Sequence, residues 1–154
     1  MKSIRYVAAA GMACLLAGPV QATPVVSHFP QQNLGLFLAG HFDLVSIRSS
    51  FGPRRLAQRT FADFGMTPTT ATETELVFDM PGDWYYRLAI VGRRDVNGDG
   101  VEDLEACFTD RAQNGGTYAS AQGLVITRYE AHGYALALSF SAADHVCRVS
   151  TGQP

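Results

Sequence analysis

Residues 84–94 read WYYRLAIVGRR, and this stretch decides the fold class. Its large apolar side chains recur at every second position, with Trp84, Tyr86 and Leu88 on one side of the chain. Successive side chains of a strand point to opposite faces of a sheet, so this spacing predicts a strand with one face in a core. The same alternation, continued to the end of the stretch, places Arg93 on the opposite face.

The same period of two recurs through most of the chain. Further strands are predicted at residues 34–38, 42–47, 76–80, 104–109, 124–129 and 134–141. A short turn around His132 and Gly133 makes the last two a hairpin, and only Pro53–Phe64 has apolar residues at a loosely helical spacing. We therefore expect a mainly β fold: a single antiparallel β-sheet domain, sandwich-like or a partly open barrel, with at most one short helix.

Residues 1–22 have the organisation of a secretory signal peptide. Lys2 and Arg5 form its positive start, residues 7–18 form a short apolar run, and a small-residue cleavage site ends at Ala22. The apolar run is shorter than the about 20 residues that cross a bilayer, so no transmembrane segment is expected. We expect export to the periplasm or the extracellular space.

Cleavage at this site leaves a chain of one domain's length, with residues 23–33 as an extended N-terminal lead-in and residues 34–154 as a single β domain. Two cysteines remain, Cys107 and Cys147, because Cys14 is removed with the signal peptide. Two cysteines in an exported chain predict one disulfide bond. Closing a loop of that length stabilises a fold by about 4 kcal/mol on the chain-entropy model.

The charge pattern argues against nucleic acid as a partner. The full chain carries 12 basic and 14 acidic residues, and removal of the signal peptide makes it more negative. No basic run extends beyond the arginine pairs at 54–55 and 93–94. Nucleic-acid binding needs a clustered positive surface, so we expect no nucleic-acid partner.

Residues 95–103 read DVNGDGVED and lie between the strands predicted at 84–94 and 104–109. Gly100 supplies the backbone freedom for a sharp bend, and oxygen donors at alternate positions around such a bend can converge on one hard cation. We predict five ligands, namely the side chains of Asp95, Asn97, Asp99 and Asp103 and the carbonyl of Val101. The bound ion would then fix the register of the two flanking strands.

A solvated hairpin turn is the alternative explanation of this loop, since Asn-Gly and Asp-Gly are common turn dipeptides. It leaves unexplained why five carboxylates lie within residues 95–105, where they would repel one another without a counter-charge. Calcium is expected rather than magnesium, because five or more protein oxygens on a flexible loop suit the larger ion.

The spacing D-x-N-x-D-G-x-x-D-L over residues 95–104 resembles the calcium loops of FG-GAP and VCBS-type repeats, and more distantly those of dockerins and EF-hands. The resemblance implies the same five ligands. Two departures limit it to the loop itself. Ala106 stands where an EF-hand has its bidentate Glu, and the chain has one copy of the motif, so no repeat-built architecture follows.

These patterns predict an exported calcium-binding domain that uses the metal and one disulfide structurally and acts, without catalysis, by binding an unknown protein or glycan partner. One alternative is an exported hydrolase with a calcium-supported site that contains Glu102, Glu105 or His41. The other is a carbohydrate-binding module that uses exposed aromatic rings, with Tyr85 and Tyr118 as candidates.

Overall fold

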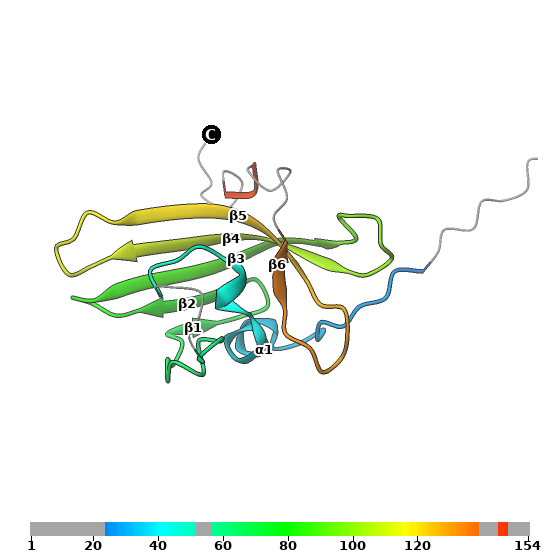
Figure 1. Ribbon diagram of the computed structural model, residues 1–154, viewed down its shortest axis with the longest axis horizontal. Coiled ribbons are helices and arrows are strands. Elements are labelled where there is room, and N and C mark those ends of the chain that lie inside the picture. Colours follow the sequence, from blue (N-terminus) through cyan, green and yellow to red (C-terminus); the bar gives the residue numbers. More distant parts are fainter. Residues whose placement is uncertain (1–23, 52–56, 139–144, 148–154) are drawn as a thin grey trace, which may run out of the picture.

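The computed structural model of the chain describes residues 24–51, 57–138 and 145–147 (Figure 1). The predicted signal peptide, residues 1–22, lies outside the described residues, and so do positions 139–141 of the last predicted strand. The elements in chain order are α1 (Leu34–His41), the 3-10 helix η1 (Leu44–Ser46), β1 (Thr70–Ala71), β2 (Glu75–Asp79), β3 (Trp84–Arg94), β4 (Asp103–Ala112), β5 (Ala119–Thr127) and β6 (Leu136–Leu138).

The six strands form one sheet in which each strand pairs antiparallel with the next strand along the chain. Within the part of the chain that the structure describes, the sheet is not closed, and β1 and β6 form its two edges. The prediction of a mainly β fold with a single antiparallel sheet and one short helix is confirmed. The strands expected at 84–94, 104–109, 76–80 and 124–129 correspond to β3, β4, β2 and β5.

Each face of the sheet carries its own apolar cluster. The helix α1 lies below the sheet in Figure 1, and the segment 145–147 lies above it. The larger cluster, on the α1 face, contains Phe29, Leu34, Leu38, Phe42, Phe61, Phe78, Tyr86, Leu88, Leu104, Phe108 and Ile126 among its buried members. Burial of each such side chain contributes about 1.5–3 kcal/mol to stability, so this face supplies most of the hydrophobic free energy.

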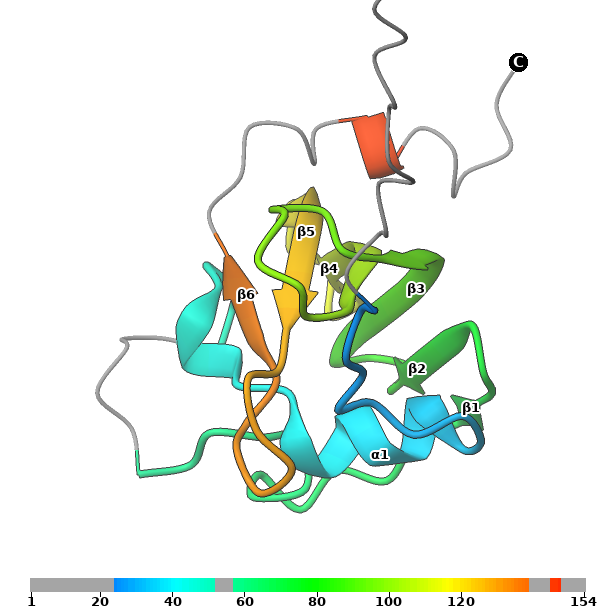
Figure 2. The same ribbon diagram turned by 90° about the vertical axis from the view of Figure 1, so that its right-hand side faces the viewer.

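The smaller cluster, on the opposite face, surrounds the predicted disulfide bond. Cys107 of β4 and Cys147 are bonded, which confirms that prediction. Val125 and Val146 are buried beside them, and Val96 of the 95–103 loop packs against the same group. The loop therefore reaches the disulfide cluster through Val96, and the segment 145–147 lies on the side of the sheet away from α1 (Figure 2).

The helix α1 contradicts the strand predicted at residues 34–38. Its first amides are capped from a distant part of the chain: Glu73 accepts hydrogen bonds from Asn33 N (2.6 Å) and Leu34 N (3.1 Å). Gly35 lies so close to the β1–β2 turn that a Cβ atom would meet the Thr72 carbonyl oxygen at 2.6 Å. The absence of a side chain therefore lets the helix approach the sheet edge.

Two other sequence expectations on the N-terminal half were wrong. The strand predicted at 42–47 is reduced to a single bridge between Phe42 and Ala135, and η1 follows it. Asp43 caps η1, because its side chain accepts a hydrogen bond from Val45 N (2.9 Å). The helix predicted at Pro53–Phe64 is absent over its described part, residues 57–64, which forms bends and turns.

A β-bulge between Ile90 and Gly92 changes the phase of β3. Before the bulge Ile90 pairs with Ala106 on the α1 face, and after it Arg93 pairs with Leu104 on that same face. The extra residue shifts the alternation by one, so the expectation that Arg93 lies opposite the core face was wrong. Arg94 therefore takes the face that carries the disulfide.

A buried hydrogen-bond group attaches the segment before residue 51 to the sheet. Asp110 of β4 is fully buried and accepts from Ser50 N (2.7 Å), Ser50 Oγ (2.9 Å) and the Tyr118 hydroxyl (3.3 Å). The Tyr86 hydroxyl lies 3.0 Å from Ser50 Oγ. Burial raises the pKa of Tyr86 to about 12, so its ring stays neutral in the folded protein well into alkaline solution.

Candidate metal centre

The 95–103 loop folds around the carboxylate of Asp95. Its Oδ1 accepts from Gly98 N (2.7 Å) and Asp99 N (3.2 Å), and its Oδ2 accepts from Gly100 N (2.9 Å). Gly98 and Gly100 have φ angles of 77° and 84°, a left-handed conformation that disfavours any residue with a Cβ. The glycines of the motif thus let the chain curl around the first predicted ligand.

Asn97 and Asp99 are bonded to each other inside this curl. The Asn97 amide nitrogen donates to Asp99 Oδ2 (2.8 Å), and Asp99 N donates to Asn97 Oδ1 (3.0 Å). Asp99 Oδ1 also accepts from Val101 N (2.8 Å). Hydrogen bonds therefore link three of the five predicted ligand residues, Asp95, Asn97 and Asp99. The backbone amide of Val101 is attached to the same group.

Asp103, the first residue of β4, lies beneath the loop and is fully buried. Its Oδ2 accepts from Val96 N (3.0 Å), which ties the start of the loop to the strand that leaves it. Its Oδ1 has less than 1 Å² of exposed surface and no hydrogen-bond partner. A carboxylate oxygen withdrawn from water normally has a donor or a cation beside it, so this atom marks an incomplete environment.

The two glutamates of the acidic stretch are each neutralised by an arginine. Arg93 Nη2 lies 2.8 Å from Glu102 Oε2, and Arg94 donates through Nε (2.9 Å) and Nη2 (2.8 Å) to both oxygens of Glu105. The bulge decides which arginine takes which face, because its shift of the alternation places Arg93 on the α1 face and Arg94 on the disulfide face.

The pKa directions agree with this pairing. Hydrogen bonds from Arg94 lower the pKa of Glu105. Burial raises the pKa of Glu102, but hydrogen bonds from Arg93 and Ser27 outweigh it, and the net shift is downward. Both glutamates are therefore charged near neutral pH and are compensated within the protein.

The three aspartates of the loop differ from these glutamates. Among the described residues, Asp95, Asp99 and Asp103 form no ion pair. The only carboxylates of the stretch that lack a positive partner there are thus the three predicted to bind calcium. The structure divides the acidic stretch into a compensated pair and an uncompensated triad.

The hydrogen bonds of the loop leave acceptor positions of Asp99 and Asp103 unused. An ionised carboxylate has about four acceptor positions, and Asp103 uses one of them while Asp99 uses two in the hydrogen bonds given above. Over residues 24–51, 57–138 and 145–147, however, no three His, Cys, Asp or Glu side chains lie close enough together to hold a metal ion. Asp103 is tied to the loop through Val96 N and does not join the other two carboxylates.

The N-terminal segment is attached to the second half of the loop. Val26 forms a parallel bridge with Val101, in which Val26 N donates to Gly100 O (2.9 Å) and Glu102 N donates to Val26 O (2.8 Å). These bonds leave the Val101 carbonyl, the fifth predicted ligand, outside the bridge.

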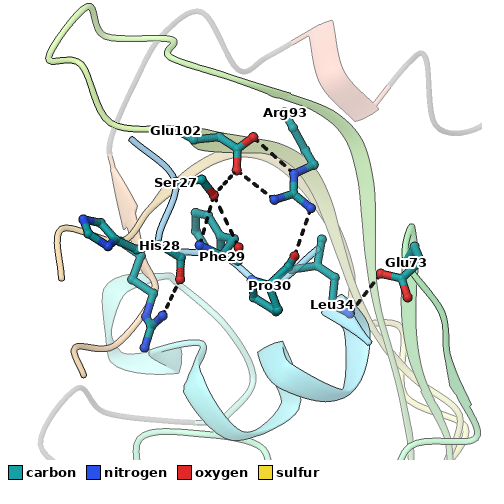
Figure 3. A network of polar contacts seen from close by, with 9 residues as sticks. Ser27, His28, Phe29, Pro30, Leu34, Glu73, Arg93 and Glu102 are labelled. Carbon is teal, nitrogen blue, oxygen red and sulfur yellow. Dashed lines mark hydrogen bonds and ion pairs between the residues drawn. The ribbon is translucent and has the colours of Figure 1, made fainter. Parts of the chain in front are cut away.

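Side chains reinforce this attachment (Figure 3). Ser27 Oγ donates to Glu102 Oε2 (2.5 Å), and Arg93 Nη1 donates to the Pro30 carbonyl (3.1 Å). Arg128 donates to the His28 carbonyl from the other side of the segment. No sequence pattern indicated this network, because its members lie up to 100 residues apart in the chain.

The residues named for the two alternative functions are not gathered into one site. His41 belongs to α1 and stacks on Phe37 on the main core face, whereas Glu105 lies on the face of the disulfide and is held by Arg94. The Tyr85 ring is covered by the Arg111 guanidinium at 4.4 Å.

Tyr118 is part of a different surface from Tyr85. Its ring meets Trp84 edge-on at 5.7 Å, and Trp84 belongs to the α1 face because it precedes Tyr86 by two residues in β3. The candidate rings therefore do not form one flat platform.

No protein-family model, no curated protein and no solved structure matches the chain. Among the helices that the structure describes, none has the length and apolar character needed to cross a membrane.

Proposed function

We propose that the chain is an exported calcium-binding β domain that is stabilised by one ion at the 95–103 loop and by one disulfide, which adjoin each other through Val96. The observation that carries the proposal is the uncompensated aspartate triad, and within it the buried Oδ1 of Asp103 that has no partner. The adjacent glutamates are matched by arginines at short distances. A selective shortage of positive charge at three aspartates is what a binding site for a divalent cation requires.

The residues that would hold the ion are those of the motif: the side chains of Asp95, Asn97, Asp99 and Asp103 and the carbonyl of Val101. When bound, calcium would supply positive charge to carboxylate oxygens that now accept only from uncharged amide groups or from nothing. Since the three carboxylates do not form one cluster, binding would draw the curl of Asp95 and Asp99 toward Asp103.

A structural use of the ion fits the surroundings of the loop. The loop joins β3 to β4, its Val96 packs on the disulfide cluster, and its Gly100 and Glu102 hold the N-terminal segment. An ion that fixes the loop would therefore fix three other parts of the fold. Glu102 and Glu105, the candidate proton-transfer groups, are occupied by arginines, which supports a structural role over a catalytic one.

Export is supported by the disulfide, because such bonds persist in oxidising compartments and are rare in the cytosol. Calcium outside the cell is millimolar, so a site with a Kd on the order of 10⁻⁴ M would be filled there.

The experiment is isothermal titration calorimetry of the purified, EDTA-stripped protein with calcium and with magnesium. We expect one calcium per chain and much weaker magnesium binding. Asp103→Asn keeps the size of the side chain and removes its charge, and it should weaken calcium binding by about tenfold or more, equivalent to about 1.4 kcal/mol.

Glu105→Gln is the matched control. It removes a charge two residues away on the same face of β4, but this charge is already paired with Arg94. Calcium affinity should then stay within about twofold of the wild type. Absence of calcium binding by the wild type, or an equal loss in both variants, would refute the proposal.

A further inference from the structure

Two buried side-chain oxygens in the described part of the chain have no hydrogen-bond partner, and they belong to facing residues. They are Asp103 Oδ1 and Thr127 Oγ1, and both residues are fully buried. Asp103 and Thr127 are direct partners in the antiparallel pairing of β4 with β5. Their side chains therefore project from the same face of the sheet, with Cβ atoms about 4.5–5.5 Å apart.

The two atoms are chemically complementary. An ionised carboxylate only accepts hydrogen bonds, whereas a threonine hydroxyl has one hydrogen to donate. A donor without an acceptor faces an acceptor without a donor at a spacing that one side-chain rotation or one water molecule can bridge. Two unrelated packing defects would have no reason to occupy paired positions.

The neighbouring groups do not satisfy either atom. Arg94 pairs with Asp103 from the β3 side, but its guanidinium is bonded to both oxygens of Glu105. On the other side of Thr127 lies Leu136 of β6, whose side chain has no polar atom. Val96 N is used by the second oxygen of Asp103. Thr127 is thus the polar side chain directly across the strand pair from the open oxygen.

We propose that Thr127 is a positioning residue of the calcium site. Its hydroxyl donates to Asp103 Oδ1, directly or through one buried water, and fixes the orientation of the carboxylate toward the loop. A carboxylate oxygen keeps a second acceptor position when it receives one hydrogen bond, so the same oxygen remains able to bind the ion. This inference rests on the proposed function, and it adds a residue 24 positions beyond Asp103 that the loop motif does not contain.

The test compares Thr127→Val, which keeps the shape and removes the hydroxyl, with Thr127→Ser, which keeps the hydroxyl. Calcium affinity is measured by calorimetry, and thermal unfolding is measured in EDTA and in calcium. We expect Thr127→Val to weaken calcium binding by about tenfold, equivalent to about 1.4 kcal/mol, and Thr127→Ser to retain most of the affinity. Thr127→Val should lower the melting temperature more in calcium than in EDTA, because in calcium it loses ion binding in addition to the hydrogen bond to Asp103.

Thr109→Val is the control for a threonine-to-valine change on the same face of β4, away from Asp103. It should leave calcium affinity unchanged. Wild-type calcium affinity in Thr127→Val, or an equal fall of its melting temperature in EDTA and in calcium, would show that Thr127 serves packing alone and would overturn the inference while leaving the calcium site intact. Failure of the wild type to bind calcium would instead overturn both proposals.

Discussion

Val26 and Val101 are bridge partners, so the first described residues of the chain are attached to the loop that we propose as a calcium site. The two hydrogen bonds of the bridge run through the backbone on either side of Val101, at Gly100 O and Glu102 N. Order in the loop and order in the N-terminal segment are therefore coupled. A loop held by an ion presents these two groups in one arrangement, whereas a mobile loop does not.

The first prediction is that calcium slows hydrogen exchange at the bridge. The amides of Val26 and Glu102 should be protected more strongly in calcium than in EDTA, because local opening of the bridge becomes rarer when the loop is fixed. Amide exchange followed by NMR measures this residue by residue. The Met80 amide, bonded to Trp84 O in the turn at the other end of β3, is the internal control and should change little. Equal protection of the bridge in both conditions would contradict the coupling.

The second prediction concerns Gly100. Its φ of 84° lies in the left-handed region, and a Cβ atom there would meet nothing within 4 Å. Gly100→Ala should therefore destabilise the protein through backbone strain alone, by about 1–2 kcal/mol. Chemical denaturation of the variant in calcium measures this loss.

Gly40→Ala is the matched control, and it should change the stability in the opposite direction. Gly40 lies in α1, and an added Cβ would again meet nothing within 4 Å. Alanine favours a helix over glycine, so this variant should be more stable than the wild type by up to about 1 kcal/mol. If both variants lost the same free energy of unfolding, the φ angle of Gly100 would not be the reason why Gly100→Ala is destabilised.

The third prediction concerns the disulfide between Cys107 and Cys147, whose partners are 40 residues apart. Replacing both cysteines by serine should lower the free energy of unfolding by about 4 kcal/mol on the chain-entropy model. Because Val96 packs against the disulfide cluster, the loss should be accompanied by weaker calcium binding. Denaturant titration and calorimetry of the double variant give the two values. Unchanged calcium affinity would show that the loop does not depend on this cluster.

The fourth prediction is a loss of stability in alkaline solution. Burial raises the pKa of Tyr86 to about 12, above the value of 10.0 for a free tyrosine. In the unfolded chain this tyrosine ionises near pH 10, whereas in the folded protein it remains neutral until about pH 12. The stabilising contribution is therefore complete below pH 10 and is lost as the pH rises between the two values.

Denaturant unfolding at a series of pH values measures this fall, and Tyr86→Phe is the comparison. The variant loses the contact with Ser50 but has no ionisable group at this position, so its stability should depend less on pH in that window. An identical pH dependence in both proteins would rule Tyr86 out as the source.

The sequence was sufficient for the sheet because the strands bury one regular face. In β3 the period of two places Tyr86 and Leu88 in the core, as expected from the residues alone. The bulge after Ile90 was not predictable, because it depends on how β3 pairs with β4 and not on the composition of β3. Its consequence, that Arg93 lies on the α1 face and Arg94 on the disulfide face, could not be foreseen either.

The helix α1 was missed for a related reason. Residues 34–38 are apolar apart from Gly35, so their local pattern fits a buried strand as well as a buried helix. Asn33 stands at the N-cap, but its side chain makes no capping hydrogen bond. The helix cap is supplied by Glu73, about 40 positions away, and the close approach at Gly35 involves the Thr72 carbonyl. Both interactions exist only after the sheet edge has formed.

For the candidate site, the sequence predicted a sharply bent loop but not the charges that surround it. The motif places Asp95, Asn97 and Asp99 in one curl, and the structure contains that curl. The pairing of Glu102 with Arg93 and the position of Thr127 opposite Asp103 are properties of strand register. These two relationships cannot be predicted from the sequence until the pairing register of the strands is known.

The most direct test of the account is thermal unfolding of the purified protein in EDTA, in calcium and in magnesium. At about 100 times its Kd, calcium should add about 2.7 kcal/mol to the free energy of unfolding, which corresponds to a rise of roughly 10 °C in the melting temperature. Magnesium should give a much smaller rise, and Asp103→Asn, with an affinity about tenfold or more weaker, should reduce the calcium effect by about half or more. The same melting temperature in EDTA and in calcium would contradict the account and leave the 95–103 loop as an acidic turn held by its own amides.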